Sequence, residues 1–503
     1  MKRQKAPSRF PRGYAGLSVL IAGVLSAANV AADDVDDMIA GLEETLKPAK
    51  PTRATAEAVN SAVAARQGLG FRSDREFVAQ ILESPQKYDA LAGSLTGGHH
   101  ATPDEVEALK IRLVLQEDAI ALSPELSEDP NFAGIYISHK NVINIGFTFK
   151  AEEKVEELRG KLRMPDRVQA FHAKSSLLEL ENNKNRVVDL TQELAADDII
   201  VSQVAIDIIN NRLKIGVVKL DPKKREILQG LFGEVDIVDK PINEVENRSD
   251  TASPMRAGVR ITNASNGSCT SNWKAQDRTT GEYVTITAGH CGPDVDGTLG
   301  GPGASFFQGS TSTGAARLLG VSDQTTWTFP TVNASNGARS GSGEVDALRA
   351  PWADNIFAMP WLYAYDKANA GAFTDGEEAR VGAVDGTVVI GTVVCSGGQF
   401  SPANQIGGSN WKNCGSVSAV NVANRFARQN GSPDSFTVLN SNVASYTAIG
   451  GDSGAPTWRI GYTSAKKWHV IAVGHHTGGP TGAEVFNDID RVEDALNVDV
   501  RFY

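Results

Sequence analysis

Residues 449–456 read Ile-Gly-Gly-Asp-Ser-Gly-Ala-Pro, a glycine-rich stretch with one serine at its centre. Ser453 lies between Asp452 and Gly454, which is the setting that a nucleophile on a tight backbone turn requires. The glycines allow a substrate carbonyl to approach closely, and successive N–H groups can point together at a developing oxyanion. A serine hydroxyl is a weak nucleophile, so this interpretation needs a base and a group that orients it. For the tetrapeptide alone, a glycine–serine loop in a β-protein is an equal alternative.

A base and an acid occur upstream in suitable settings. His290 stands in Thr-Ala-Gly-His-Cys (287–291), after an expected strand and behind small residues. A histidine with a pKa near ~6.5 suits general-base work at neutral pH. Asp346 lies between apolar residues in Glu-Val-Asp-Ala-Leu (344–348), and a buried carboxylate beside a histidine fixes its tautomer. Either residue alone is as well explained by packing, whereas the order His, Asp, Ser favours a catalytic group.

Composition divides the chain into two differently built regions. At 503 residues, two or three domains are expected, and a net charge of -11 argues against nucleic acid or an anionic membrane as the main partner. All four cysteines and all seven tryptophans lie from Cys269 onward, while the part before them is rich in Lys and Glu. Cys269 is expected to pair with Cys291 and to hold the turn that carries His290. The two regions are therefore expected to meet near residue 250.

The N-terminus is typical of an export signal over residues 1–32. A basic head precedes an apolar stretch from Ala15 to about Val30, and small residues end it before Asp33-Asp34. A retained membrane anchor is the alternative, and no other segment is apolar enough to span a bilayer. Export fits an even number of cysteines, because disulfides persist in oxidising compartments.

Residues 33–250 divide into a helical part (33–125) and a repeated part (133–240). Helices are expected over 36–42, 54–66, 76–82 and 103–121. The repeated part has the pattern strand, strand, helix, strand twice, which indicates a duplicated α+β unit suited to touch a partner surface. Its expected elements are 134–137, 142–147 and 152–162, then 205–208, 213–218, 222–231 and 234–238. The pair His99–His100 has no further ligand at useful spacing, so no metal or cofactor is expected.

Residues 241–256 form a linker without periodicity, and short apolar runs separated by turn formers follow it. Many short strands with frequent turns indicate a sandwich or barrel, with one helix near 490–496. The strands expected most clearly are 258–261, 283–286, 381–384, 387–390 and 470–473.

The motifs TAGHC (287–291) and GDSGAP (451–456) resemble the two signatures of chymotrypsin-like serine peptidases, and the cysteine pairs resemble the secreted bacterial branch of streptogrisins and α-lytic protease. The resemblance implies an all-β double six-stranded antiparallel barrel over residues 251–503, with the site between the barrels, and a second disulfide between Cys395 and Cys414. The long stretches 295–343 and 350–376 would shape the substrate cleft.

The resemblance also assigns roles to single residues. His290 would be the base, Asp346 the orienting acid and Ser453 the nucleophile, with the N–H groups of Gly451 and Ser453 as the oxyanion hole. Asp354 is a rival for the acid, but its Trp-Ala-Asp-Asn loop is less suitable than the apolar strand expected at Asp346. The residues expected to bind substrate are Ala448, Gly450, His476, Thr477, Gly478 and Gly479.

His476 falls where glutamyl endopeptidases carry a pocket histidine, which would favour Glu or Asp before the scissile bond. Ala448 lies on the opposite wall, where some of those enzymes have a hydroxyl. Segment 33–250 resembles the large pro-regions of the same branch, which assist folding and are then cleaved away. Glu244 and Glu246 offer sites for self-cleavage.

The sequence therefore predicts a secreted, extracellular or periplasmic serine endopeptidase acting on proteins or peptides, without a cofactor and without a membrane partner after export. A catalytically silent secreted binding protein with the same fold is the alternative. A lipase is excluded by the order His, Asp, Ser and the lack of a G-x-S-x-G elbow, and a zinc peptidase by the lack of H-E-x-x-H.

Overall fold

The computed structural model divides the chain into two compact units, Met1–Pro51 and Thr52–Tyr503. Residues described in the second unit are 56–83, 101–241, 255–258, 260–263, 267–292, 303–308, 317–329, 331–332, 339–353, 358–362, 379–397, 413–427, 435–448, 451–462, 468–480 and 482–501. The expected export signal, the helix over 36–42, most of the linker, and His99, His100, Glu244, Glu246, Asp354 and Gly450 lie outside them. Within these ranges no helix is long and apolar enough to cross a membrane.

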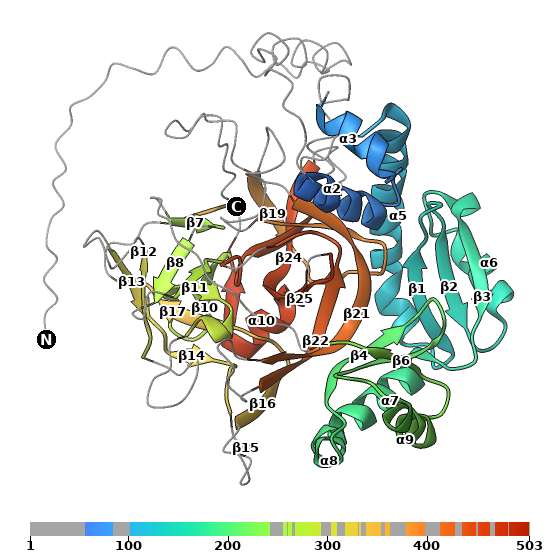
Figure 1. Ribbon diagram of the computed structural model, residues 1–503. Helices are drawn as coiled ribbons and strands as arrows, with labels where there is room; N and C mark the ends of the chain where they lie inside the picture. Colours follow the sequence, from blue (N-terminus) through green and yellow to red (C-terminus); the bar gives the residue numbers. More distant parts are fainter. Residues whose placement is uncertain are drawn as a thin grey trace, which may run out of the picture. The chain divides into compact units, whose positions relative to one another are not determined.

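The predicted helices that fall within the described residues form. They are α2 (Ala56–Leu69), α3 (Arg75–Glu83) and α5 (Pro103–Ser127). Helix α5 begins with a capping box, in which the Thr102 hydroxyl accepts the Glu105 N–H and the Glu105 carboxylate accepts the Thr102 N–H. It packs against β1 (Phe132–Ile137) on one side and β23 (Pro456–Tyr462) on the other, so it joins the first half of the unit to the second (Figure 1).

Two ββαβ units follow, and their strands pair in the same way. In each unit the first two strands are antiparallel and the last lies parallel to the second. The first unit is β1 (Phe132–Ile137), β2 (Ile143–Phe147), α6 (Ala151–Arg159) and β3 (Val168–His172), and the second is β4 (Val201–Asp207), β5 (Arg212–Val217), α9 (Pro222–Phe232) and β6 (Asp236–Asp239). The sequence analysis missed helices α7 (Leu177–Asp189) and α8 (Thr191–Ala196) between them.

The chain after residue 254 is mostly β-sheet, as predicted. A four-stranded sheet has the order β13-β12-β8-β9, and a five-stranded sheet the order β14-β17-β11-β10-β26. Their bounds are β8 (Arg260–Asn263), β9 (Ser268–Thr270), β10 (Lys274–Asp277), β11 (Tyr283–Thr287), β12 (Ser305–Gln308), β13 (Arg317–Val321), β14 (Gln324–Thr325), β17 (Leu348–Pro351) and β26 (Val498–Val500).

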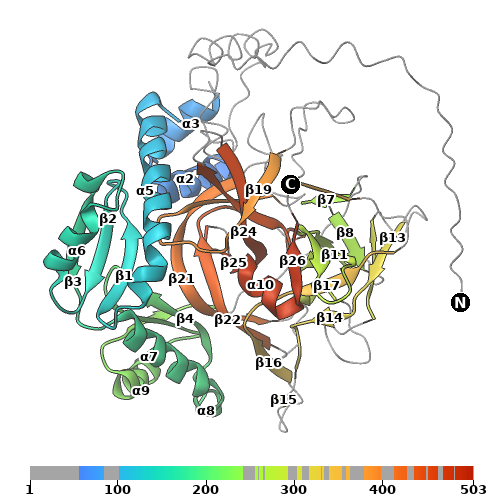
Figure 2. The same cartoon turned by 180° about the vertical axis from the view of Figure 1, so that it is seen from behind.

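The largest sheet runs β15-β16-β22-β25-β24-β23-β20-β21-β4-β5-β6, with β7, β18 and β19 attached off this path. The new strands are β7 (Met255–Ala257), β15 (Thr331–Val332), β16 (Arg339–Gly343), β18 (Ala358–Leu362), β19 (Ala379–Val384), β20 (Val393–Ser396), β21 (Asn413–Ala427), β22 (Ser435–Ala444), β24 (Trp468–Gly478) and β25 (Glu484–Asp488). Helix α10 (Ile489–Leu496) packs against β24, β25 and β26 (Figure 2). The second ββαβ unit therefore continues the sheet that carries residues 475–477.

The prediction of a strand over 387–390 is wrong. Among these residues only Ile390 pairs, through an isolated parallel bridge to Tyr136 of β1. The chain then turns at Gly391, whose φ is 91°. Val389 and Ile390 bury their side chains in the clusters formed by the two ββαβ units. The apolar side chains of Val389 and Ile390 are therefore used to pack against the first half of the unit, and not to form a strand.

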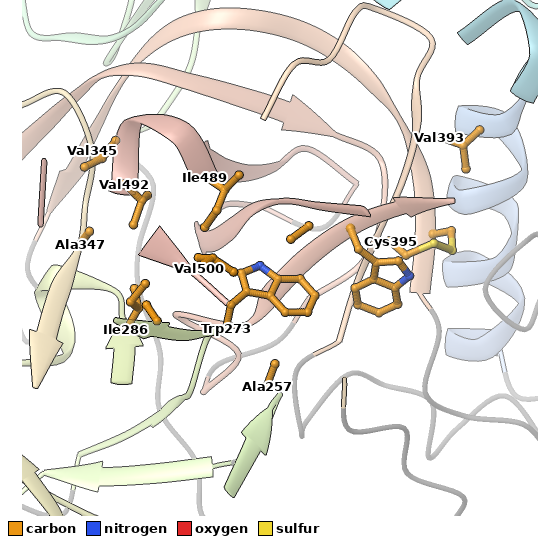
Figure 3. Packing of buried hydrophobic residues seen from close by; sticks show 14 of the residues in the cluster. Ala257, Trp273, Ile286, Val345, Ala347, Val393, Cys395, Ile489, Val492 and Val500 are labelled. Carbon is orange, nitrogen blue, oxygen red and sulfur yellow. A yellow bond between two sulfur atoms is a disulfide. The ribbon is translucent and has the colours of Figure 1, made fainter. Parts of the chain in front are cut away.

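One apolar cluster surrounds the segment that carries Asp346. Val345 and Ala347 point into it on either side of this residue, together with Trp273 and Ile286 (Figure 3). Phe71 belongs to the same cluster, so residues from before and after the expected linker share a core. Both predicted disulfides form, Cys269–Cys291 and Cys395–Cys414.

Phe436→Ala is expected to destabilise the unit strongly. Phe436 is fully buried and stacks on Trp327 with ring centroids 4.3 Å apart, so removing its ring leaves a cavity. The loss should be about 3–5 kcal/mol, measured as the shift in urea-induced unfolding. Phe149→Ala is the matched control, because Phe149 is 59% exposed and its loss should cost less than about 0.5 kcal/mol. Equal effects of the two changes would contradict this packing.

Candidate active site

His290 is positioned at the end of a strand, as predicted. Strand β11 ends at Thr287, and a single 3-10 turn, Gly289–Cys291, follows it. The disulfide from Cys291 to Cys269 ties this turn to β9. A side chain at Gly289 would place its Cβ 2.8 Å from Asp346 Oδ1, so only glycine permits this close approach.

Asp346 is fully buried and holds His290 with two hydrogen bonds. Its Oδ1 accepts the His290 backbone N–H at 3.0 Å, and its Oδ2 lies 2.6 Å from His290 Nδ1. This geometry directs Nδ1–H to the carboxylate. Nε2 is then buried with no partner among the described residues. The lone pair of a neutral His290 ring therefore lies on Nε2.

The prediction that Asp346 lies on a strand is wrong. Residues 344–347 connect β16 to β17 without strand pairing. The aspartate is held there by side chains from two other strands. Its N–H donates to Asn487 Oδ1 at 2.9 Å, and its carbonyl oxygen lies 2.6 Å from His475 Nε2. Burial lowers the pKa of His475, so its ring is neutral at pH 7 and donates from Nε2.

Ser453 lies on a turn that packs against the His290 segment. Gly451 and Gly454 adopt positive φ values of 100° and 85°, which the turn requires. The Ser453 carbonyl accepts the Thr270 N–H at 2.8 Å and lies 3.9 Å from Cys291 Sγ, next to His290. Its hydroxyl donates to the Thr477 carbonyl at 3.4 Å. Within the described residues Ser453 makes no hydrogen bond with His290.

The two amides predicted as an oxyanion hole have no acceptor in the part of the chain that the structure describes. They are the N–H groups of Gly451 and Ser453. The next amides are occupied, because the Gly454 N–H donates to the His476 carbonyl and the Ala455 N–H to the Asp452 carbonyl, both at 2.7 Å. Unpaired donors beside a serine hydroxyl suit an oxyanion.

Trp327 contacts His290, and sequence reasoning missed it. The two ring centroids lie 5.5 Å apart in an edge-on arrangement. Trp327 is 3% exposed and comes from the long stretch 295–343, which the sequence analysis expected to shape the cleft. Its ring walls off one side of the histidine from water.

Two of the predicted specificity residues bond the turn that carries Ser453: the Thr477 carbonyl accepts the Ser453 hydroxyl, and the His476 carbonyl accepts the Gly454 N–H. His476 Nδ1 lies 3.0 Å from the Tyr446 hydroxyl, and burial lowers the pKa of His476 to about 3. Glu484, which the sequence analysis did not consider, accepts the Ala448 N–H at 3.1 Å. Gly478 and Gly479 follow Thr477 at the end of β24.

No metal site is formed where histidine and cysteine atoms gather. Ligand atoms of Cys269, His290 and Cys291 lie within 4.8 Å of one another. Both sulfurs belong to one disulfide, so neither is a thiolate that could bind a metal.

Comparison with known proteins gives structural likenesses only. No protein-family model and no curated protein matches this chain. A glutamic-acid-specific serine protease, described as using a histidine triad in substrate binding, is similar at 17% identity and a TM-score of 0.32, over 49% of this chain and 100% of its own. Protease A of Thermobifida fusca is similar at 16% and 0.31, over 50% and 100%. An α-lytic protease homolog, N4, is similar at 20% and 0.31, over 49% and 99%.

Asp346→Asn is expected to slow covalent labelling of Ser453 by a serine-directed organophosphate about 10³–10⁴-fold, because the amide would favour the wrong tautomer of His290. The rate is read by mass spectrometry of the Ser453 peptide. Asp277→Asn is the control, since Asp277 is also buried but pairs with Arg349 at 2.5 Å. Labelling at the normal rate in Asp346→Asn would exclude Asp346 as the orienting acid.

Proposed function

We propose that this chain is a serine endopeptidase that hydrolyses peptide bonds through an acyl-enzyme. The observation that carries the proposal is the buried Asp346–His290 pair, beside the turn that presents Ser453. Among the described residues His290 Nε2 has no partner. The amides of Gly451 and Ser453, which have no acceptor within the same ranges, would supply the oxyanion hole. The expected double six-stranded barrel and export from the cell belong to the same proposal.

The reaction begins when the Ser453 hydroxyl leaves the Thr477 carbonyl and donates to His290 Nε2. Oγ then attacks the substrate carbonyl, and the proton passes to Nε2. Asp346 stabilises the imidazolium, while the amides of Gly451 and Ser453 stabilise the oxyanion. The imidazolium gives its proton to the leaving amine, and water hydrolyses the acyl-enzyme by the same steps in reverse.

The proposed preference for Glu or Asp before the scissile bond rests on His476. The pKa of Tyr446 is raised by burial, so its hydroxyl keeps its proton and donates to His476 Nδ1. The neutral ring then carries its own proton on Nε2, where it can donate to a substrate carboxylate. Because the ring is uncharged, this preference depends on hydrogen bonding and not on a positive charge.

Segment 33–250 is proposed to be a pro-region that assists folding and is then removed. Its second ββαβ unit adds to the largest sheet, since Val204 and Gln203 of β4 pair with Ala423 and Asn424 of β21. The Lys184 ammonium of α7 donates to the Asn421 carbonyl and to Asn440 Oδ1, at 2.9 and 3.0 Å.

These contacts fall on β21 and β22, and β22 also pairs with two strands that are distant in the sequence, β16 (Ser340 with Ser435) and β25 (Ser441 with Asn487). Long-range strand pairing is slow, so a preformed edge at β4 would hasten it.

Ser453→Ala should abolish peptide hydrolysis and removal of the pro-region, while the protein remains folded. Cleavage of a peptide library and the size of the purified chain are the measurements. In the wild type, a serine-directed inhibitor should label Ser453 stoichiometrically. No labelling of a folded wild type would favour the silent binding protein, and an active Ser453→Ala protein would overturn the proposal.

Refolding of residues 257–503 should depend on residues 33–250 added in trans. Lys184→Met in the added segment should weaken its binding by about 1–3 kcal/mol, because the two acceptors on β21 and β22 lose their buried donor. Lys174→Met is the matched control, since the Lys174 side chain is 79% exposed. Equal yields of active protein with and without the segment would exclude a folding role.

A further inference from the structure

Glu484 is a buried carboxyl group that the proposed mechanism does not use. It is the first residue of β25, next to the strand that carries His476, and is 1% exposed. Its Oε1 accepts the Ala448 N–H at 3.1 Å, and its Oε2 lies 4.0 Å from His476 Nε2. Ala448 and His476 are the two residues expected on opposite walls of the specificity pocket. Glu484 therefore connects these walls.

The described groups that face Glu484 do not include a cation at neutral pH. His476 on β24 is neutral, because burial lowers its pKa to about 3. Tyr446, after β22, is neutral because burial raises its pKa. Asp452, in the turn before β23, carries the same sign of charge as a Glu484 carboxylate. Burial is the main reason why the pKa of Glu484 lies well above its ordinary value, and the negative charge of Asp452 raises it further. The hydrogen bond from the Ala448 N–H acts in the opposite direction.

The separation of Glu484 Oε2 and His476 Nε2 would allow one further atom to bond both. At 4.0 Å, Oε2 and Nε2 are too far apart to hydrogen-bond to each other. A carboxylate oxygen between them would accept from both, provided that each carries a proton. A cation or a neutral donor would instead need Glu484 as an acceptor.

We propose that Glu484 is a specificity residue that binds an acidic substrate side chain as a protonated carboxylic acid and rejects it as a carboxylate. The proposal rests on the peptidase activity proposed above. In the acid form, the Glu484 O–H and the His476 Nε2–H both donate to the substrate carboxylate. When Glu484 loses its proton, the two carboxylates repel each other, and a neutral or cationic side chain becomes the better substrate.

The test is the ratio of kcat/KM for two peptides that differ only in Glu or Gln before the scissile bond. In the wild-type protein this ratio should fall about tenfold or more as the pH rises through the raised pKa of Glu484, because two carboxylates held together in a buried site repel each other. Effects of pH that are independent of the substrate side chain act on both peptides equally and cancel in the ratio. Glu484→Gln should make the ratio constant, because its amide N–H donates at every pH.

Glu493→Gln is the matched control. Glu493 is another carboxyl group that accepts a backbone N–H, from Val500, and burial raises its pKa to about 7. It lies on α10, away from Ala448 and His476, so this variant should keep the wild-type dependence on pH.

The outcomes separate the two proposals. If the wild type cleaves the Gln peptide but its ratio of kcat/KM for the Glu and Gln peptides does not change with pH, the proposed role of Glu484 is wrong. The peptidase proposal is then unaffected. A wild-type dependence that persists in folded Glu484→Gln also overturns the role of Glu484. No cleavage of either peptide by the wild type overturns the peptidase proposal itself. If Glu484→Gln does not fold, the wild-type ratio still decides.

Discussion

The carboxylate of Asp346 is fully buried, and both of its oxygens are engaged by one residue, His290. An isolated buried carboxylate would be costly by several kcal/mol, so the rest of the site must supply partners for it. His475 and Asn487 bond its backbone from β24 and β25. Val345 and Ala347 anchor the same segment in the apolar cluster (Figure 3). The position of His290 therefore depends on strands that lie far from it in the sequence.

The same strands link the site to the first half of the unit. Strand β25 pairs with β22, β22 with β21, and β21 with β4 of the second ββαβ unit. Helix α5 adds a further bond, since Gln116 accepts the Val393 N–H at 2.9 Å at the start of β20. A segment that stabilises this sheet during folding would also stabilise β24 and β25, which hold Asp346 through His475 and Asn487. This connection is the physical basis for the proposed folding role of segment 33–250.

Local motifs were sufficient to single out His290 and Ser453, whose segments lie together in the structure. His290 and Ser453 are each flanked by small residues of the kind that tight turns need. The Ser453 carbonyl lies 3.9 Å from Cys291 Sγ, next to His290. Asp346 was predicted from apolar neighbours, although it lies on a connection and not on a strand. Helix α7 was missed, yet Ser176 and Glu179 form a capping box that marks its start in the sequence.

Residues that act through long-range contacts left no such local signal. Asn487 bonds Asp346 across 141 residues, and neither sequence stretch indicates the other. Trp327 and Glu484 likewise owe their place in the site to contacts with residues that are distant in the sequence, His290 and Ala448. The run 387–390 has the composition of a strand, but its side chains are used for a contact with β1, which composition cannot distinguish.

The central claim is that Asp346 holds the proton of His290 on Nδ1 and leaves Nε2 free to accept the proton of Ser453. Nitrogen-15 NMR of histidine-labelled Ser453→Ala protein, at a pH where the ring is neutral, measures this directly. His290 should be protonated on Nδ1 and unprotonated on Nε2. A neutral His290 with its proton on Nε2 would contradict the claim.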